Sequence, residues 1–591
     1  MSDIVSERYR VPLCPYLAIG NQRVLIHLDA FGVPQSLQWP RPGSPDRLAL
    51  RDPADEWPYW DELPAESVRA QMPYLDYGGG RRDYLHEAKT VAADYLEDTN
   101  IFRGRCDLPG GARVELVSFV LPRADVWMRR YRVVGRGRFV LQGEFFTRAV
   151  RGHPGAHLGH VDFRGILDAE PRGLYVLMST LPLESRQGRV ELTVDGELEW
   201  TVCLSLAADL VGAVAAGRAA LERGFEGAQA ETAAADRAWV ARARPPARRH
   251  PFVRARYKRW LLANRLCTTA DGATLAGPRP FWSFSWPRDS SLIGAAYAAA
   301  GFLEEARRFV AWHLACLPPS GIHEARYLTD GTPMLLDNRL RQGDNPGFVA
   351  WAAAFICLRE WDEAFARSIE RPFFAMADAL AAARDPDTAL PLPEADFREG
   401  EKAQTLSLVL SAAGGLKAAG DLARRLGDTA RAARYAARAA EITRAIEARF
   451  WDPARGVLIR SFRPRDERTD IAVFYGAFPF RVWEPTSPLI RQAVQRAQAE
   501  AWDAGTGAIL NGRGTPWESF WFYHSAMLLA AVAALGDRAA ESAILDALSR
   551  NVSPQGLVPE QIGAANGHLW GCSYLTTAQG CLLLYAYMPE A

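Results

Sequence analysis

The hydrophobic pattern changes its period once along the chain, and this change restricts the folds available to it. From Tyr9 to about Leu206, apolar and polar residues alternate in short runs separated by Gly, Pro and Asp, a pattern typical of strands joined by turns. The expected strands are Gln22–Asp29, Ala112–Val120, Trp127–Val134, Arg138–Phe146, Gly173–Met178 and Arg189–Leu204. Many short strands of this kind predict a β-sandwich domain over residues 1–206.

From Pro251 to the end, almost every segment has the spacing of an amphipathic or wholly apolar helix. Examples are Val253–Thr268, Leu303–Leu317, Gly347–Arg359, Thr405–Leu426, Thr429–Phe450, Ser519–Leu535 and Arg538–Asn551. At roughly 28 residues for each helix and its loop, about a dozen helices fit this part, which suits a closed double ring of helices. We therefore expect a multidomain chain, with an all-α domain over residues 250–591.

Residues 207–249 join the two parts. Their Ala/Arg/Glu-rich composition has helical spacing and ends at the adjacent prolines Pro245 and Pro246, which stop a helix. This stretch is predicted to be a helical linker.

Charge and cysteine usage narrow the classes of function. Lysine plus arginine and aspartate plus glutamate both number 69, so no long-range field draws nucleic acid or an anionic membrane surface, and a neutral substrate is favoured. No stretch reaches the roughly 18 uninterrupted apolar residues that span a bilayer, and the start of the chain does not resemble a signal peptide. The eight cysteines include no Cys-x-x-Cys pair and the ten histidines are dispersed, so we expect reduced thiols, a cytoplasmic location and no metal site.

The stretch Phe281–Ser291 reads Phe-Trp-Ser-Phe-Ser-Trp-Pro-Arg-Asp-Ser-Ser. Aromatic faces cover the apolar side of a sugar ring, while a guanidinium and a carboxylate, here Arg288 and Asp289, bind its hydroxyls. The alternative is an ordinary helix start, in which Asp289 favours the helix dipole.

Two further loops contain acidic residues that are candidates for catalysis. Glu560 lies among apolar and turn residues near the end of the chain, whereas one earlier loop carries four acids: Glu394, Asp396, Glu399 and Glu401. Glycoside hydrolysis requires two carboxyl groups in different surroundings, one protonated and one ionised. The acids of the earlier loop are also explained by the dipole of the helix that follows them.

Taken together, these motifs resemble glycoside hydrolase family 15, the glucoamylase family. Its Trp-x-Arg-Asp motif is matched by residues 286–289 and its Glu-Gln pair by Glu560 and Gln561. The resemblance implies that Arg288 and Asp289 hold the terminal sugar, that Trp282 lies beside the reacting carbon, and that Glu560 is the general base.

Weaker similarities extend over nearly the whole chain. They comprise Ile19–Pro40, which resembles the β-sandwich of prokaryotic members, Tyr327–Gly331, Gln342–Gly347, Gly514–Trp517 and the closing Leu569, Trp570, Ser573 and Tyr574. By the same resemblance, substrate binding is expected to involve Trp286, Asp344, Trp517, Gln561 and Trp570. The fold implied is a β-sandwich followed by an (α/α)₆ barrel.

The chain departs from the family pattern in two places. The family has its general acid in Asp-x-Trp-Glu, and the best match here, residues 396–399, lacks the tryptophan. Glu399 is favoured as the acid, with Asp396 and Glu394 as alternatives. The second departure is the segment Gly507–Arg513, which lacks the family's Arg-Tyr and leaves the linkage preference open.

The function implied by the resemblance is an inverting, exo-acting hydrolase that releases glucose from the non-reducing end of α-gluco-oligosaccharides, without a cofactor. Two alternatives use the same scaffold: a trehalase or a transglucosylase. A phosphorylase is less favoured, because no basic, glycine-rich phosphate pocket is evident. A different class of protein is a catalytically inactive sugar-binding homologue.

Overall fold

The computed structural model describes most of the chain. The described residues are 17–44, 72–142, 151–152, 158–162, 174–181, 184–186, 189–278, 282–335, 339–400, 402–503, 506, 508–511, 518–564, 569–570, 572 and 574–589. The predicted site residue Trp517 and the acid Glu401 lie outside them.

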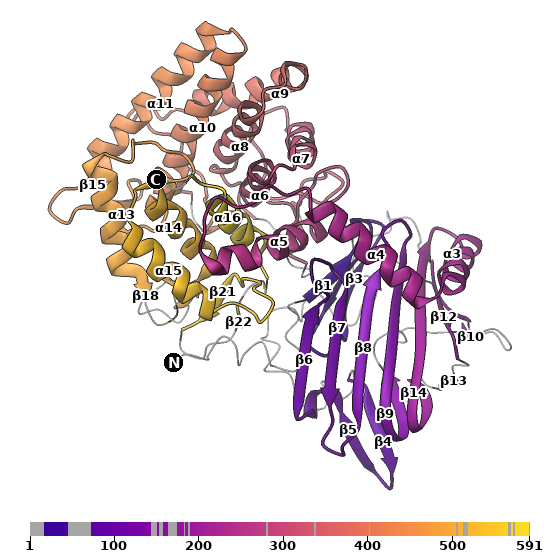
Figure 1. The fold of residues 1–591 in the computed structure, drawn as a ribbon. Coiled ribbons are helices and arrows are strands. Elements are labelled where there is room, and N and C mark those ends of the chain that lie inside the picture. Colours follow the sequence, from indigo (N-terminus) through magenta and orange to yellow (C-terminus); the bar gives the residue numbers. More distant parts are fainter. Residues whose placement is uncertain are drawn as a thin grey trace.

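An eleven-stranded antiparallel sheet dominates the N-terminal region (Figure 1). Its main path is β10-β11-β12-β14-β9-β8-β7-β6, with β13 paired to β14, β4 to β9 and β5 to β4. The strands are β4 (Tyr74–Gly78), β5 (Arg81–Tyr84), β6 (Thr90–Tyr95), β7 (Phe102–Asp107), β8 (Arg113–Val120), β9 (Val126–Gln142), β10 (Arg151–Gly152), β11 (Leu158–Asp162), β12 (Leu174–Ser179), β13 (Glu184–Arg186) and β14 (Arg189–Ala207).

One strand prediction is wrong in its division. Trp127–Val134 and the described part of Arg138–Phe146 form a single strand, β9, which pairs with β14 along its whole length. The intervening Gly135 and Gly137 lie within this strand. A side chain at either position would crowd its neighbours, since a Cβ on Gly135 would lie 2.8 Å from Ala112 Cβ and one on Gly137 would lie 2.6 Å from the Asp76 carbonyl oxygen. These glycines allow close approach within the sheet.

A second, three-stranded sheet belongs to the same region and consists of β1 (Leu17–Gly20), β2 (Leu25–Leu28) and β3 (Pro34–Gln38). The turn between β2 and β3 packs against the large sheet, since a Cβ on Gly32 would clash with Leu116 and Phe102. The predicted sandwich-like β region is therefore confirmed.

Helices α3 (Leu210–Arg223) and α4 (Phe225–Val240) follow the sheet. Asp209 caps α3 by accepting a hydrogen bond from the Gly212 amide at 2.7 Å, and Gly224, with φ of 76°, separates the two helices. Packing joins α3 to β12 and β14 and joins α4 to the first helix of the next region. These two helices occupy the stretch expected to be a linker.

The rest of the chain is mainly helical. Its helices are α5 (Pro251–Leu266), α6 (Pro287–Ala300), α7 (Leu303–Ala315), α8 (Asn345–Arg359), α9 (Glu363–Ala382), α10 (Leu406–Arg425), α11 (Thr429–Arg449), α12 (Val473–Ala477), α13 (Pro488–Ala501), α14 (Phe522–Ala534), α15 (Arg538–Arg550) and α16 (Thr576–Ala586). The expectation of about a dozen helices agrees with these described elements.

The even-numbered helices form a closed inner ring. Packing contacts run from α6 to α8, α10, α12, α14 and α16, and then back from α16 to α6. Helices α6 and α16 are buried on every side, whereas the outer helix α11 buries only one face. This difference explains the two hydrophobic patterns, and the ring confirms the predicted (α/α)₆ barrel.

Helix α10 has the length and composition of a membrane-spanning helix, but 83% of its most apolar window is buried inside the protein. Its place in the inner ring accounts for its apolar character.

The helical region also contains short strands. They are β15 (Trp451–Asp452), β16 (Val457–Ser461) and β17 (Asp466–Thr469) in one sheet, and β18 (Trp502–Asp503), β19 (Ala508–Asn511), β20 (Ser519–Trp521), β21 (Gln561–Gly563) and β22 (Leu569–Trp570) in another. The predicted helix Ser519–Leu535 is corrected here, because its first three residues form β20. Pairing of β20 with β21 brings Trp521 opposite Gln561, next to Glu560.

Candidate active site

A cavity of about 280 Å³ opens at the end of the barrel where the inner helices begin. Its lining comes from the loops before α6, α8, α10, α14 and α16 and from the first turns of α6 and α14. The residues are Ala276, Trp282, Trp286, Arg288, Asp289, Arg339, Phe397, Arg398, Glu399, Trp521, Tyr523, Glu560, Gln561 and Leu575. Segments far apart in the sequence meet here because the inner helices start at the same end of the ring.

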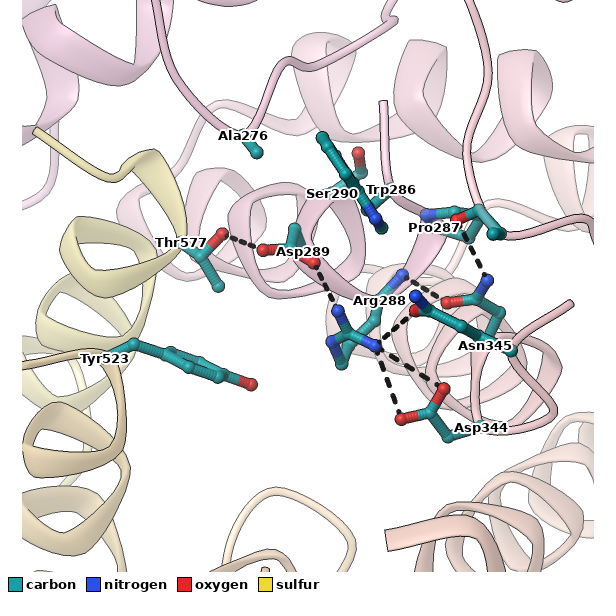
Figure 2. A network of polar contacts seen from close by, with 12 residues as sticks. Ala276, Trp286, Pro287, Arg288, Asp289, Ser290, Asp344, Asn345, Tyr523 and Thr577 are labelled. Atoms are coloured by element: carbon teal, nitrogen blue, oxygen red, sulfur yellow. Dashed lines mark hydrogen bonds and ion pairs between the residues drawn. The ribbon is translucent and has the colours of Figure 1, made fainter. Parts of the chain in front are cut away.

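Arg288 lies on the floor of this cavity between two carboxylates (Figure 2). Its guanidinium is 3.2 Å from Asp289 Oδ2 and 3.4 Å from Asp344 Oδ2, and it donates a hydrogen bond of 2.7 Å to Gln342 Oε1. Burial disfavours the charge, but Asp344 and Asp289 outweigh it and raise the pKa of Arg288. Arg288 is therefore a fixed cation at the base of the cavity.

Asp344 is fully buried and does not line the cavity. It accepts a hydrogen bond of 3.0 Å from Ser407 Oγ in addition to its contacts with Arg288. The structure thus gives this predicted binding residue a supporting position behind Arg288.

Asp289 is in the first turn of α6 and lines the cavity. Its Oδ1 accepts a hydrogen bond of 2.6 Å from the Thr577 hydroxyl (Figure 2). Its Oδ2 is buried and accepts no hydrogen bond from the described residues, apart from the ion pair with Arg288. A ligand hydroxyl would satisfy this oxygen.

The N-terminal region supports the aromatic segment. Gln38 Nε2, at the end of β3, donates hydrogen bonds of 2.6 Å to Ser283 Oγ and 3.0 Å to the Pro278 carbonyl. The flanking Trp282 and Trp286 line the cavity, with Trp521 and Phe397 contributed by other loops. Such aromatic walls suit the apolar face of a sugar ring.

Among the described acids of the 394–401 loop, Glu399 is the one that lines the cavity. Its Oε1 accepts hydrogen bonds of 2.9 Å from Gln342 Nε2 and 3.3 Å from Trp286 Nε1, and its Oε2 is ion-paired with Arg339. Its φ of 57° is unusual for a residue with a side chain, and such positions cluster at functional sites.

The two alternative acids do not line the cavity. Asp396 is buried and binds the Arg398 amide at 2.9 Å and its guanidinium at 3.1 Å, which shapes the turn that presents Glu399. Glu394 is ion-paired with Arg341 and lies 3.5 Å from Lys402. Neither has the cavity position that proton donation requires.

Glu560 enters the cavity from another side. It immediately precedes β21, and its Oε2 accepts a hydrogen bond of 2.9 Å from the Cys572 amide. Its neighbour Gln561 also lines the cavity and accepts a hydrogen bond of 3.0 Å from Ser519 Oγ. Trp570 pairs with Gln561 across β21 and β22.

Several residues of the site were not among those predicted. Gln342 joins the two halves of the site by bonding both Arg288 and Glu399. Tyr523 lines the cavity and shares a hydrogen bond of 2.9 Å with Tyr475. Burial is the main cause, and the neighbouring Tyr475 the next, of a raised pKa for Tyr523, so its hydroxyl keeps its proton. The segment containing Gln342 resembled the family, but Tyr523 lay in an apolar helix start without a distinguishing signal.

Among the described residues, no group of three or more His, Cys, Asp or Glu side chains is placed to hold a metal ion.

Comparisons with known proteins bear on the fold. A bacterial glucoamylase solved in complex with acarbose is similar over 97% of this chain and 94% of that chain, with a TM-score of 0.71 and 10% sequence identity. A glycosidase in complex with glucose (59% of this chain, 97% of that chain, TM-score 0.49, 19% identity) and a glucoamylase from Saccharomycopsis fibuligera (56% and 92%, TM-score 0.44, 13% identity) are also similar. No family model and no curated protein matches the chain. The first of these similarities shows that the chain has a glucoamylase-like fold, as the resemblance to glycoside hydrolase family 15 predicted.

Proposed function

Starting from this glucoamylase-like fold, we propose that the chain is a glycoside hydrolase that releases glucose from the non-reducing end of α-gluco-oligosaccharides with inversion. One observation carries the proposal: Glu399 and Glu560, from loops far apart in the sequence, line the same cavity above the Arg288–Asp289 pair. The bacterial glucoamylase with the same fold was solved with acarbose, a further reason to choose a sugar substrate.

In the proposed reaction, Glu399 gives its proton to the glycosidic oxygen as the bond from that oxygen to C1 breaks. Glu560 takes a proton from a water molecule whose oxygen attacks C1 from the opposite face. The net change is the addition of one water, and both carboxyl groups return to their starting states after proton exchange with solvent. Inversion requires the two carboxyl groups to stand about 6.5 to 9.5 Å apart.

Closure of the cavity floor supports exo action. Asp344 is completely buried behind Arg288, and the inner helices continue below both residues. A chain end fits such a blind cavity, whereas an internal sugar unit requires a cleft open at both sides. Arg288 and Asp289 are proposed to hold the hydroxyls of the terminal ring.

The test is incubation with maltose, isomaltose and trehalose, following the anomer released by NMR. Release of β-glucose from maltose or isomaltose supports the proposal. Cleavage of trehalose alone would indicate a trehalase, and products longer than the substrate would indicate a transglucosylase. Absence of hydrolysis with saturable sugar binding would indicate an inactive sugar-binding protein.

Two variants distinguish the roles of the two carboxyl groups. Glu560→Gln removes the base and should abolish turnover of every substrate. Glu399→Gln should spare α-glucosyl fluoride, because fluoride leaves without protonation. If Glu399→Gln hydrolyses maltose as fast as the wild type, the acid has been assigned to the wrong residue.

A cytoplasmic location stays part of the proposal. Fractionation of the producing cells, with a cytoplasmic marker as the reference, tests it.

A further inference from the structure

Arg339 has a position that the proposed hydrolysis does not by itself require. It lines the cavity, is ion-paired with Glu399, and lies with its guanidinium carbon 5.9 Å from the Trp286 ring centroid. A guanidinium stabilises the ionised form of a carboxyl group beside it. While this ion pair persists, Glu399 is held in the form that cannot donate a proton.

Side-chain exposure indicates which part of the cavity is its floor and which part is its mouth. Arg288 on the floor and Asp344 behind it have side chains that are 7% and 0% exposed, whereas those of Arg339 and Glu399 are 14% and 29% exposed. The terminal sugar ring belongs on the floor beside Arg288, and the bond to be broken faces Glu399. The leaving group therefore extends toward the mouth of the cavity, where Arg339 lies.

We propose that Arg339 is a specificity-determining residue that binds an anionic group on the leaving-group side, so that the preferred substrates are α-glucosides whose leaving group carries a carboxylate or phosphate. This inference rests on the proposed function and specifies its substrate class. Guanidinium groups bind both anions through paired hydrogen bonds.

Binding of such a substrate exchanges one ion pair for another. The substrate anion takes the guanidinium of Arg339, and Glu399 is released while Gln342 and Trp286 still contact its Oε1. Glu399 then takes a proton from solvent and gives it to the glycosidic oxygen. A neutral leaving group offers Arg339 no anion in exchange. The Arg339–Glu399 ion pair must then open without a replacement partner, so neutral substrates are hydrolysed more slowly.

Arg341 provides a matched control two residues further along the same segment. It is also ion-paired with a glutamate, Glu394, but it does not line the cavity. Replacing it removes an arginine and breaks a similar ion pair without touching the leaving-group side.

The experiment compares 4-carboxyphenyl α-D-glucoside with its neutral partner 4-carbamoylphenyl α-D-glucoside. We expect the wild type to favour the carboxylate about 10- to 100-fold in kcat/KM, which is the effect of one hydrogen-bonded charge pair. Arg339→Gln should bring the ratio close to one, Arg339→Lys should retain part of it, and Arg341→Gln should leave it at the wild-type value. Raising the ionic strength should reduce the wild-type preference.

Calorimetric binding of both glucosides to Glu560→Gln separates this inference from the proposed function. Preferential binding of the carboxylate that disappears when Arg339→Gln is added supports the anion subsite, even if the wild type hydrolyses neither compound and the proposed function fails. Equal binding of the two glucosides, no binding of either, or an equal change in preference in Arg339→Gln and Arg341→Gln would overturn the inference.

Discussion

Replacement of Asp289 by asparagine tests whether the Arg288–Asp289 pair binds substrate or only begins a helix. The asparagine carbonyl can still accept the Thr577 hydrogen bond of 2.6 Å, and Arg288 keeps Asp344 and Gln342. The main loss is the charge on Oδ2, the buried oxygen that accepts no hydrogen bond from the described residues. Asp289→Asn should therefore change binding more than stability.

The expected magnitude follows from the strength of a hydrogen bond to a charged group. Such a bond is worth about 1.5 to 3 kcal/mol, and about 1.4 kcal/mol corresponds to a tenfold change. We expect kcat/KM to fall about 10- to 100-fold, while the free energy of unfolding falls by less than about 1.5 kcal/mol because most contacts of the site remain.

Asp344→Asn is the contrasting variant. Asp344 is fully buried and does not line the cavity, so the change breaks a buried charge pair out of reach of the substrate. Removing one partner of such a pair costs about 3 kcal/mol or more. Its first effect should be on stability.

The assay combines steady-state kinetics on maltose with urea unfolding of both variants. Normal kinetics for Asp289→Asn, together with a loss of stability equal to that of Asp344→Asn, would refute the sugar-binding role. Asp289 would then be an acidic residue that favours the dipole of α6.

Three other expectations concern stability and positioning. His323 has its pKa lowered by burial to about 4, so the unfolded chain takes up its proton first as the pH falls, and about 3 kcal/mol of stability should be lost between roughly pH 6.5 and pH 4 in urea unfolding. Gly347→Ala should lower the urea midpoint by forcing α8 away from α10, because its Cβ would overlap the Ser411 carbonyl, whereas Gly420→Ala, with 3.4 Å to the nearest atom, should be neutral or stabilising. Gln342→Leu removes the amide that holds both Glu399 and Arg288, so it should lower kcat on maltose about 10- to 100-fold and also raise KM, and an unchanged kcat would contradict this positioning role.

Much of the fold follows from local sequence pattern, and the two errors in the predicted elements have tertiary causes. Alternation of apolar residues predicts the β region, but it divides β9 into two strands on either side of Gly135 and Gly137. Here the neighbouring strands come so close that only glycine fits, and β9 continues. The helix predicted to begin at Ser519 begins three residues later in the structure, at Phe522, because pairing with the distant β21 holds Ser519–Trp521 as a strand.

The candidate site divides in the same way. Adjacent residues such as Arg288 and Asp289 are visible in one stretch of sequence, and the acidic loop was identified as a whole. Which acid of that loop reaches the cavity depended on a turn closed by Asp396 and on the left-handed backbone of Glu399. Neither feature has a pattern that sequence alone reveals.

The sequence by itself determined the two kinds of region, the order of the elements and the residue types available for sugar chemistry, because these depend on periodicity and composition over short distances. Only the tertiary structure decided that six inner helices close into a ring with their beginnings at one end. That closure brings Glu399, Glu560 and Arg339 into one cavity with Arg288. Contacts between residues hundreds of positions apart depend on how the helices pack, and the packing is a property of the whole barrel.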